Sequence, residues 1–314
     1  MKLVSIRSEN GLKPGALIGE NVLDFTKAAA LFPKCGPVGK SLKHILSLGQ
    51  AGLDTAKALI DAATGESDAL SDVFSDVFSP VKSTPLACPL PDPGIIICAG
   101  QTYRSHVLEM SKRRGIKNPE MPETPRGFLK NPNAVIGPGD DIVLPASHPN
   151  HVDFEGEFAF VIGKDCHDIA GVDAMDYVAG YTLINDVSAR DWAGGKGTRD
   201  QTLLGKQFPT FCPLGPVLAT KDEIPNPASV VLTTHLNGEL MQTGRADDLL
   251  FPMEEILSWY SRFYQFRAGD IITTGTPGGT GHGRDPKIFL APGDRIEISV
   301  DGIGTLTNNV KSKF

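Results

Sequence analysis

The sequence predicts an α+β protein rich in β-structure, with a small N-terminal α+β domain and a larger domain built as a mixed β-roll or sandwich. After about residue 94, strand-like segments outnumber helical ones, and no helical crossovers recur at the spacing of a βαβ unit. A proline cluster at residues 85–93 separates this region from a front part with its own strands and helices. The predicted domains are therefore residues 1–85 and 90–314.

The N-terminal domain is expected to open with short strands separated by Gly, Pro and Asn turns. Helices are expected near residues 40–48 and 53–63. In the larger domain the strand signals are short apolar or alternating segments: GIIICAG from 94, AVIGPGDDIVLP from 134, FEGEFAFVIG from 154, YVAGYTLIND from 177, SVVLTTHLNGEL from 229, DIITTGTP from 270 and DRIEISVDGIGTLTNNV from 294.

Helices in the larger domain are expected over residues 103–112 and 253–263, with a single turn at 170–175. Residues 113–127, RGIKNPEMPETPRGF, are rich in proline and charge, which predicts an exposed and mobile loop.

Composition excludes several classes of protein. The chain has 314 residues, of which 40% are hydrophobic, and no apolar run approaches the length of a membrane span. The N-terminus lacks the apolar core of a secretory signal, so we expect a cytoplasmic protein. Five scattered cysteines without a CxxC pair indicate reduced thiols. A net charge of −7 without long basic runs argues against nucleic acid or a membrane as partner.

The segment DFEGEFAFVIG at 153–163 places aromatic and aliphatic residues on one face of a strand and Asp153, Glu155 and Glu157 on the other. Residues two apart lie roughly 6.6 Å apart along a strand, and two charges about 5 Å apart repel by about 3 kcal/mol at an effective dielectric near 20. Either solvent or a cation must relieve this repulsion. An acidic face in water and a cation site both remain open at this point.

A second segment, GYTLINDVSARDW at 180–192, ends an apolar strand at Asp186. Glu155, Glu157 and Asp186 together offer three hard oxygen ligands, with no Cys or His among them. This set favours Mg²⁺, Mn²⁺ or Ca²⁺ over zinc. Three protein ligands leave coordination positions for water and substrate, as a catalytic ion requires.

Other residues are candidates for chemistry. His106 and Glu109 lie three apart on an expected helix, so they are neighbours on one face, either as surface residues or as a base and its partner. Lys206, flanked by Leu204 and Phe208, either points inward or extends along the surface to solvent.

The motifs DFEGEFAFVIG, YVAGYTLINDVSARD, LGKQFPTFCPLGP (204–216) and GDIITTGTPGG (269–279) occur in the order seen in the fumarylacetoacetate hydrolase family, which this chain closely resembles. The resemblance runs from about Ile95 to the C-terminus. The front segment is similar to the small N-terminal domain of longer bacterial members. The resemblance implies the fold of that family for the larger domain.

The resemblance also implies a metal site. In the family a Glu-x-Glu pair and a later Asp hold Mg²⁺ or Mn²⁺, and these residues correspond to Glu155, Glu157 and Asp186. The additional upstream Asp of the animal enzymes has no counterpart in CAGQTYRSH, so three protein ligands are expected. Asp153 is not a ligand in the family, and we expect it either beside the ligands or exposed.

Catalytic and substrate-binding roles follow from the same resemblance. His106 and Glu109 would lie on a lid helix, with His106 activating water and Glu109 orienting it. Lys206 would stabilise developing negative charge. The residues expected at the substrate are Lys130, Arg190, which either meets a substrate oxygen or fixes the Asp186 loop, and Thr276. His282 lies outside the shared pattern and is either a loop residue or a specificity residue.

The function predicted from the sequence is metal-dependent hydrolysis of a C–C bond in an acylpyruvate-like or fumarylacetoacetate-like 1,3-dicarbonyl compound or 2-oxo acid. Alternatives within the family are oxaloacetate decarboxylase, 2-hydroxydienedioate isomerase and 2-keto-3-deoxy sugar acid dehydratase. An alternative of another class is a metal-binding or ligand-binding module without catalysis. Similar proteins are homodimers, so a homodimer is expected.

Overall fold

The computed structural model describes residues 1–65, 76–193 and 201–313. Within these residues the strands form a 12-stranded sheet, a 5-stranded sheet and a 2-stranded ribbon, accompanied by short helices. The predicted β-rich α+β class is confirmed. Among the same residues, no helix is long and apolar enough to cross a membrane.

The N-terminal region combines strands with helices that cover them. Its elements are β1 (Lys2–Ser8), β2 (Gly11–Ile18), β3 (Asn21–Asp24), α1 (Phe25–Leu31), η1 (Pro33–Cys35), α2 (Leu42–Ser47), α3 (Gln50–Gly65), β4 (Phe78–Pro80), η2 (Val81–Ser83) and β5 (Leu86–Ala87).

The remainder is dominated by strands. Its first half contains β6 (Ile96–Gly100), α5 (Arg104–Arg113), β7 (Arg126–Lys130), η3 (Pro132–Ala134), β8 (Val135–Ile136), β9 (Ile142–Leu144), β10 (Val152–Asp153), β11 (Gly156–Ile162), η4 (Gly171–Tyr177), β12 (Val178–Asn185) and β13 (Ser188–Ala189). Its second half contains α6 (Thr202–Gly205), β14 (Cys212–Thr220), η6 (Pro227–Ser229), β15 (Val231–Leu236), β16 (Glu239–Arg245), η7 (Ala246–Asp248), α7 (Met253–Ser261), β17 (Ile271–Thr273), η8 (Gly281–Gly283), β18 (Arg295–Val300) and β19 (Gly304–Ser312).

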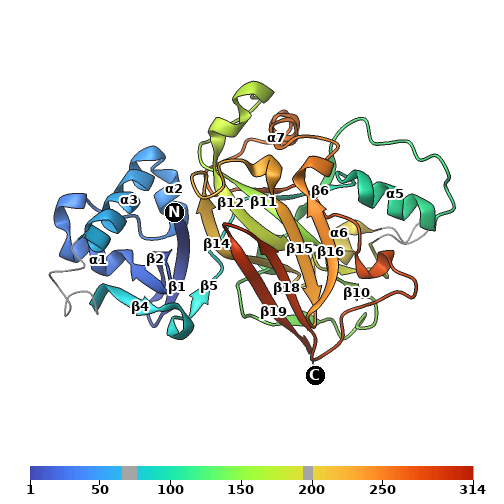
Figure 1. Cartoon of the computed structure of the whole chain (residues 1–314), viewed down its shortest axis with the longest axis horizontal. Coiled ribbons are helices and arrows are strands. Elements are labelled where there is room, and N and C mark those ends of the chain that lie inside the picture. The colour runs from blue at the N-terminus through green and yellow to red at the C-terminus, as the bar shows by residue number, and fades with distance from the viewer. Residues whose placement is uncertain (66–75, 194–200, 314) are drawn as a thin grey trace.

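One large sheet runs through both regions. Ten of its strands follow the order β4-β3-β2-β1-β14-β12-β11-β17-β6-β7, and the other two, β5 and β8, pair with β1 and β14. The two regions join where β1 pairs antiparallel with β14, Leu3 opposite Leu218. Figure 1 shows the N-terminal helices at one end of the molecule and α5 at the other. The expected boundary at residues 85–90 contains the short strand β5 and precedes β6. The division into domains 1–85 and 90–314 stays a prediction, and the two parts share the large sheet.

The expected helices at 40–48, 53–63, 103–112 and 253–263 are present as α2, α3, α5 and α7. Sequence patterns did not reveal α1, which begins where the Asp24 side chain accepts hydrogen bonds from two helical amides. They also did not predict β14 as a strand. Its two prolines, Pro213 and Pro216, lack amide donors and mask the pattern of a strand that lies mid-sheet.

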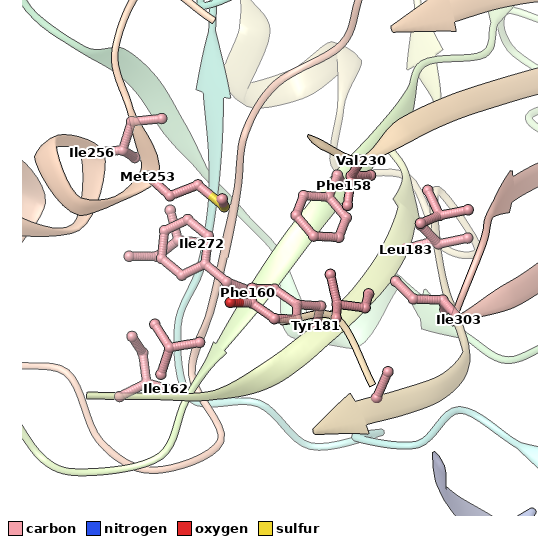
Figure 2. Close-up of a cluster of buried hydrophobic side chains, with 14 of the residues drawn as sticks. Phe158, Phe160, Ile162, Tyr181, Leu183, Val230, Met253, Ile256, Ile272 and Ile303 are labelled. Atoms are coloured by element: carbon pink, nitrogen blue, oxygen red, sulfur yellow. The ribbon is translucent and has the colours of Figure 1, made fainter. Parts of the chain in front are cut away.

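Strand β11 is buried on both faces. Phe158, Phe160 and Ile162 point into a core that α7 covers, and the Phe158 ring stacks on Tyr181 at 5.2 Å between centroids. Figure 2 shows Met253 and Ile256 of α7 closing this core over the β11 side chains. Ala159 and Val161 face a second core. Because alternate residues point to opposite faces, Glu157 shares the face of Ala159 and Val161.

Candidate active site

Two neighbouring strands bring the acidic residues to one end of the large sheet. β11 and β12 pair antiparallel with Gly156 opposite Asn185, so the start of one strand lies beside the end of the other. The Asp186 amide donates to the Glu155 carbonyl at 2.8 Å, and the Glu155 amide donates to the Asn185 side chain at 3.0 Å. These hydrogen bonds fix Glu155 and Asp186 side by side.

The acidic face of the strand does not lie in water. Glu155, Glu157 and Asp186 are 6%, 1% and 1% exposed. The alternative of a solvated acidic face is therefore wrong. Carboxylates buried to this extent must be paired or protonated, since the cost of desolvating an isolated charge is large.

Two buried lysines neutralise part of this charge. Lys130, on β7, places Nζ 2.5 Å from Asp186 Oδ1 and 3.1 Å from the Val187 carbonyl. Lys206 Nζ lies 2.6 Å from Glu155 Oε2, contacts Asp186 Oδ2 and sits 5.0 Å from the centre of the Phe128 ring. Burial lowers the pKa of Lys206, but Asp186 and Glu155 outweigh it and raise the pKa above its ordinary value. Of the two orientations open for Lys206, the structure shows the inward one.

Arg190 connects Glu155 to Asp153. Its Nε and Nη2 donate to Asp153 Oδ2 at 2.8 and 2.6 Å, and Nη2 also contacts Glu155 Oε1. Burial opposes ionisation of Glu155, yet Lys206 and Arg190 outweigh it and hold the pKa of this carboxyl well below its usual range. A contact between Arg190 and a substrate oxygen stays a prediction.

Asp153 is fully buried, which corrects the alternative that it is exposed. Its Oδ1 accepts a hydrogen bond from the Gly281 amide at 2.8 Å, and its Oδ2 accepts one from the His282 amide at 3.1 Å. A Cβ on Gly281 would meet the Ile288 carbonyl at 1.9 Å, so only glycine allows this approach. Asp153 therefore holds the glycine-rich segment 278–283 against the acidic cluster.

Glu157 stands apart from these pairs. Its Oε2 has no hydrogen-bond partner, and burial first, then Asp186 and Glu155, raise its pKa well above the ordinary range. The cluster contains one more acidic than basic side chain, with four carboxylates (Asp153, Glu155, Glu157, Asp186) facing three cations (Lys130, Arg190, Lys206). An orphaned buried carboxylate beside two others fits a divalent cation that prefers oxygen ligands.

The donor atoms that are close enough to share one ion in this conformation are not those of the expected trio Glu155, Glu157 and Asp186. Among the described residues, one group of His, Cys, Asp and Glu donors lies within 4.8 Å of one another, and it comprises Cys98, Glu157 and Asp186. Glu155 is adjacent but outside this group, and both it and Asp186 are ion-paired with two cations each. The trio Glu155, Glu157 and Asp186 stays a prediction from the family resemblance.

The expected His106–Glu109 pair lies on α5, with His106 Nδ1 3.5 Å from Glu109 Oε2. Both Glu109 oxygens lie 3.1 Å from the Gly279 amide, which donates to them. Gly279 has φ +97°, and a Cβ there would meet the Met241 carbonyl at 2.2 Å. Burial opposes ionisation of Glu109, but His106 and this amide lower its pKa. The pair is therefore attached to the same glycine-rich segment that Asp153 holds.

A cavity of about 1080 Å³ opens beside His106, between α5 and the loop that leads to β7. Gln101, Met110 and Arg126 line it together with residues of that loop. The loop is largely exposed, as predicted. The cavity is large enough for a small organic acid.

Thr276 is buried beside the start of β11. Its hydroxyl donates to the Gly156 carbonyl at 2.9 Å and accepts from Gln242 Nε2 at 2.8 Å. These bonds position the segment after β17, and contact with a substrate carboxylate stays a prediction. Gln242 was not identified from the sequence, because an isolated Gln in a strand carries no recognisable pattern.

The comparisons with known proteins agree with this architecture. The family model described as fumarylacetoacetate (FAA) hydrolase C-terminal matches residues 95–311. The chain belongs to this family. The resemblance inferred from the motifs is thereby confirmed.

Three relatives show the range within the family. Oxaloacetate tautomerase YisK of Bacillus subtilis is 38% identical over 312 residues, which cover 99% of this chain and 100% of that protein. A solved structure of fumarylacetoacetate hydrolase from Exiguobacterium antarcticum has a TM-score of 0.77 at 32% identity and covers 100% of both chains. Maleylpyruvate hydrolase from Sphingobium sp. SYK-6, in complex with manganese(II) and pyruvate, has a TM-score of 0.72 at 26% identity and covers 99% of both chains. Membership therefore indicates an enzyme family whose members carry more than one activity.

Proposed function

We propose that this protein is a divalent-metal-dependent enzyme that interconverts the keto and enol forms of a 2-oxo dicarboxylic acid such as oxaloacetate. The observation that carries the proposal is the match along the whole chain to oxaloacetate tautomerase YisK, together with a buried carboxylate cluster that has an unpartnered oxygen on Glu157. This replaces hydrolysis, the activity first expected from the sequence, as the leading candidate. Enolisation uses the same groups as hydrolysis, without the attack of water.

In this proposal one group of residues stabilises negative charge and another transfers the proton. Glu157 and Asp186, with Glu155 as the resemblance implies, would hold Mg²⁺ or Mn²⁺, which supplies Lewis-acid polarisation of a carbonyl when bound. The charged Lys206, held between Glu155 and Asp186, places positive charge where an enolate oxygen would develop.

His106 is the proposed proton acceptor. Its Nδ1 faces Glu109, which orients the ring and leaves Nε2 to take a proton from carbon 3 of the substrate. The C–H electron pair becomes the C=C bond, and the carbonyl oxygen becomes the enol oxygen when it receives a proton in turn. The attachment of Glu109 to Gly279 holds the pair in place, and His106 lines the cavity.

Hydrolysis of an acylpyruvate is the second candidate. The His106–Glu109 pair could equally activate water, and the similar maleylpyruvate hydrolase has that type of activity in its name. The two reactions differ in whether a C–C bond breaks. Decarboxylation of oxaloacetate, which also breaks a C–C bond, differs from both in releasing carbon dioxide.

A single set of assays separates these reactions. Purified protein with Mn²⁺ or Mg²⁺ would be given oxaloacetate in D₂O, and loss of the carbon-3 protons would be followed by NMR while enol absorbance and pyruvate release are measured in parallel. An acylpyruvate would be tested for cleavage. We expect rapid, chelator-sensitive enolisation. Cleavage of the acylpyruvate without faster enolisation would identify a hydrolase, and a metal-dependent rise in Tm without any turnover would identify a binding module.

The base is tested by His106→Gln, with the exposed His167→Gln as the matched control. We expect enolisation to fall by roughly 10²–10⁴-fold in the first variant and to persist in the second. We further propose a homodimer, as in similar proteins, which light scattering would check.

A further inference from the structure

Cys98 belongs to the donor group found among the described residues, and neither the family resemblance nor the proposed reaction uses it. It lies on β6 and is fully buried. Its sulfur lies within 4.8 Å of a carboxylate oxygen of both Glu157 and Asp186, which in turn lie within that distance of each other. A single ion between these three atoms would reach all of them.

An independent observation points to a ligand at this place. Glu157 is 1% exposed, and its Oε2 has no hydrogen-bond partner. Glu155 is held at both oxygens by Arg190 and Lys206, and Asp186 by Lys130 and Lys206, so either carboxylate must give up a contact with a cation to bind an ion. Glu157 and Cys98 are the two donors of the described group that are not engaged in an ion pair, and Asp186 is the carboxylate that lies within reach of both.

The donor set decides which ions suit this position. One sulfur and two carboxylate oxygens form a mixed set that favours borderline and soft ions such as Zn²⁺, Co²⁺ and Cd²⁺, whereas Mg²⁺ prefers oxygen alone. A thiol must lose its proton to bind such an ion, so each ion bound releases one proton from sulfur as the metal–sulfur bond forms.

We propose that Cys98, Glu157 and Asp186 form a binding site for a thiophilic divalent cation, which overlaps the position expected for the catalytic ion. Zn²⁺ at this site excludes Mg²⁺ from Glu157 and Asp186. Which ion is bound therefore depends on the concentration of each ion and on how soft that ion is. This proposal rests on the proposed function only in that Glu157 and Asp186 belong to both metal sites. Its test measures binding and requires no turnover.

Co²⁺ is a suitable probe because thiolate ligation gives a charge-transfer band in the near ultraviolet. Metal-free protein would be titrated with Co²⁺, and the band is expected in the wild type and absent from Cys98→Ala. Cys212→Ala is the matched control. Cys212 is a fully buried cysteine of the same core that lies outside the donor group, and its variant should keep the band.

X-ray absorption of the Zn²⁺-bound wild type provides a test that needs no variant. We expect one sulfur at about 2.3 Å from zinc, with oxygen or nitrogen completing the shell. A shell of oxygen and nitrogen alone, or an unchanged Co²⁺ band in Cys98→Ala, would overturn the proposal. Because these measurements do not involve oxaloacetate, an absence of tautomerase activity would leave their outcome interpretable.

Discussion

Replacement of Lys206 by methionine tests the central electrostatic feature of the site. The substitution keeps most of the apolar stem but removes the ammonium group that lies 2.6 Å from Glu155 and also contacts Asp186. Both carboxylates then lose one of two buried partners, because Arg190 still pairs with Glu155 and Lys130 with Asp186. Breaking a buried ion pair by removing one member costs about 3–5 kcal/mol when the remaining charge is uncompensated, so this range is the upper bound for Lys206→Met.

A divalent ion should offset part of this loss. At a concentration of 100 times its Kd, a ligand that binds only the folded state adds about 2.7 kcal/mol. Removing the ammonium also removes a cation that competes for Glu155 and Asp186, so Mn²⁺ should stabilise Lys206→Met more than it stabilises the wild type. Mn²⁺ is thus expected to restore roughly half or more of the lost stability.

The assay is urea unfolding at neutral pH, in EDTA and in excess Mn²⁺. The matched control is Lys57→Met, which breaks an exposed pair with Asp61 and should leave the urea midpoint close to that of the wild type. If Lys206→Met in EDTA is within about 1 kcal/mol of the wild type, the buried ion pair does not stabilise the fold as reasoned here.

Three further predictions address other parts of the molecule. Burial, then nearby cations, lower the pKa of His282 from 6.5 to about 4, so between these pH values the unfolded chain binds a proton at His282 and the folded chain does not. The free energy of unfolding should therefore fall as the pH drops from 6.5 to 4. His282→Gln should reduce this pH dependence, measured as urea midpoints. Phe160→Ala, at a fully buried site, should cost about 3–5 kcal/mol in urea unfolding, whereas the 65% exposed Phe263 should tolerate alanine within about 0.5 kcal/mol; equal losses would contradict the assigned core. Asp153→Asn should weaken the charged acceptor of the Gly281 amide and speed its hydrogen exchange, and unchanged protection would exclude the positioning role.

The pattern of the sequence was sufficient to locate the strands that build the site. Alternation in DFEGEFAFVIG is a local property, because successive side chains of any strand point to opposite faces. The same holds for the three-residue spacing of His106 and Glu109, which places both on one side of α5. Such signals survive in a single sequence because they depend on neighbours along the chain.

Burial of the acidic face could not be read from the strand itself. Glu155 and Glu157 have the same alternation whether the face meets water or a protein interior. The acidic face can be buried because Lys130 and Lys206, which come from other segments of the chain, pair with its carboxylates and offset their charge.

Length, apolar content and strand periodicity, which are set by the order of residues, determined that this chain forms a β-rich α+β protein with an acidic strand pair. Only the tertiary structure decided that Asp153 is buried against Arg190, that Cys98 lies beside Glu157, and that β1 joins the sheet through β14. These features unite residues far apart along the chain. Their pairing depends on strand order and register, which no local pattern specifies.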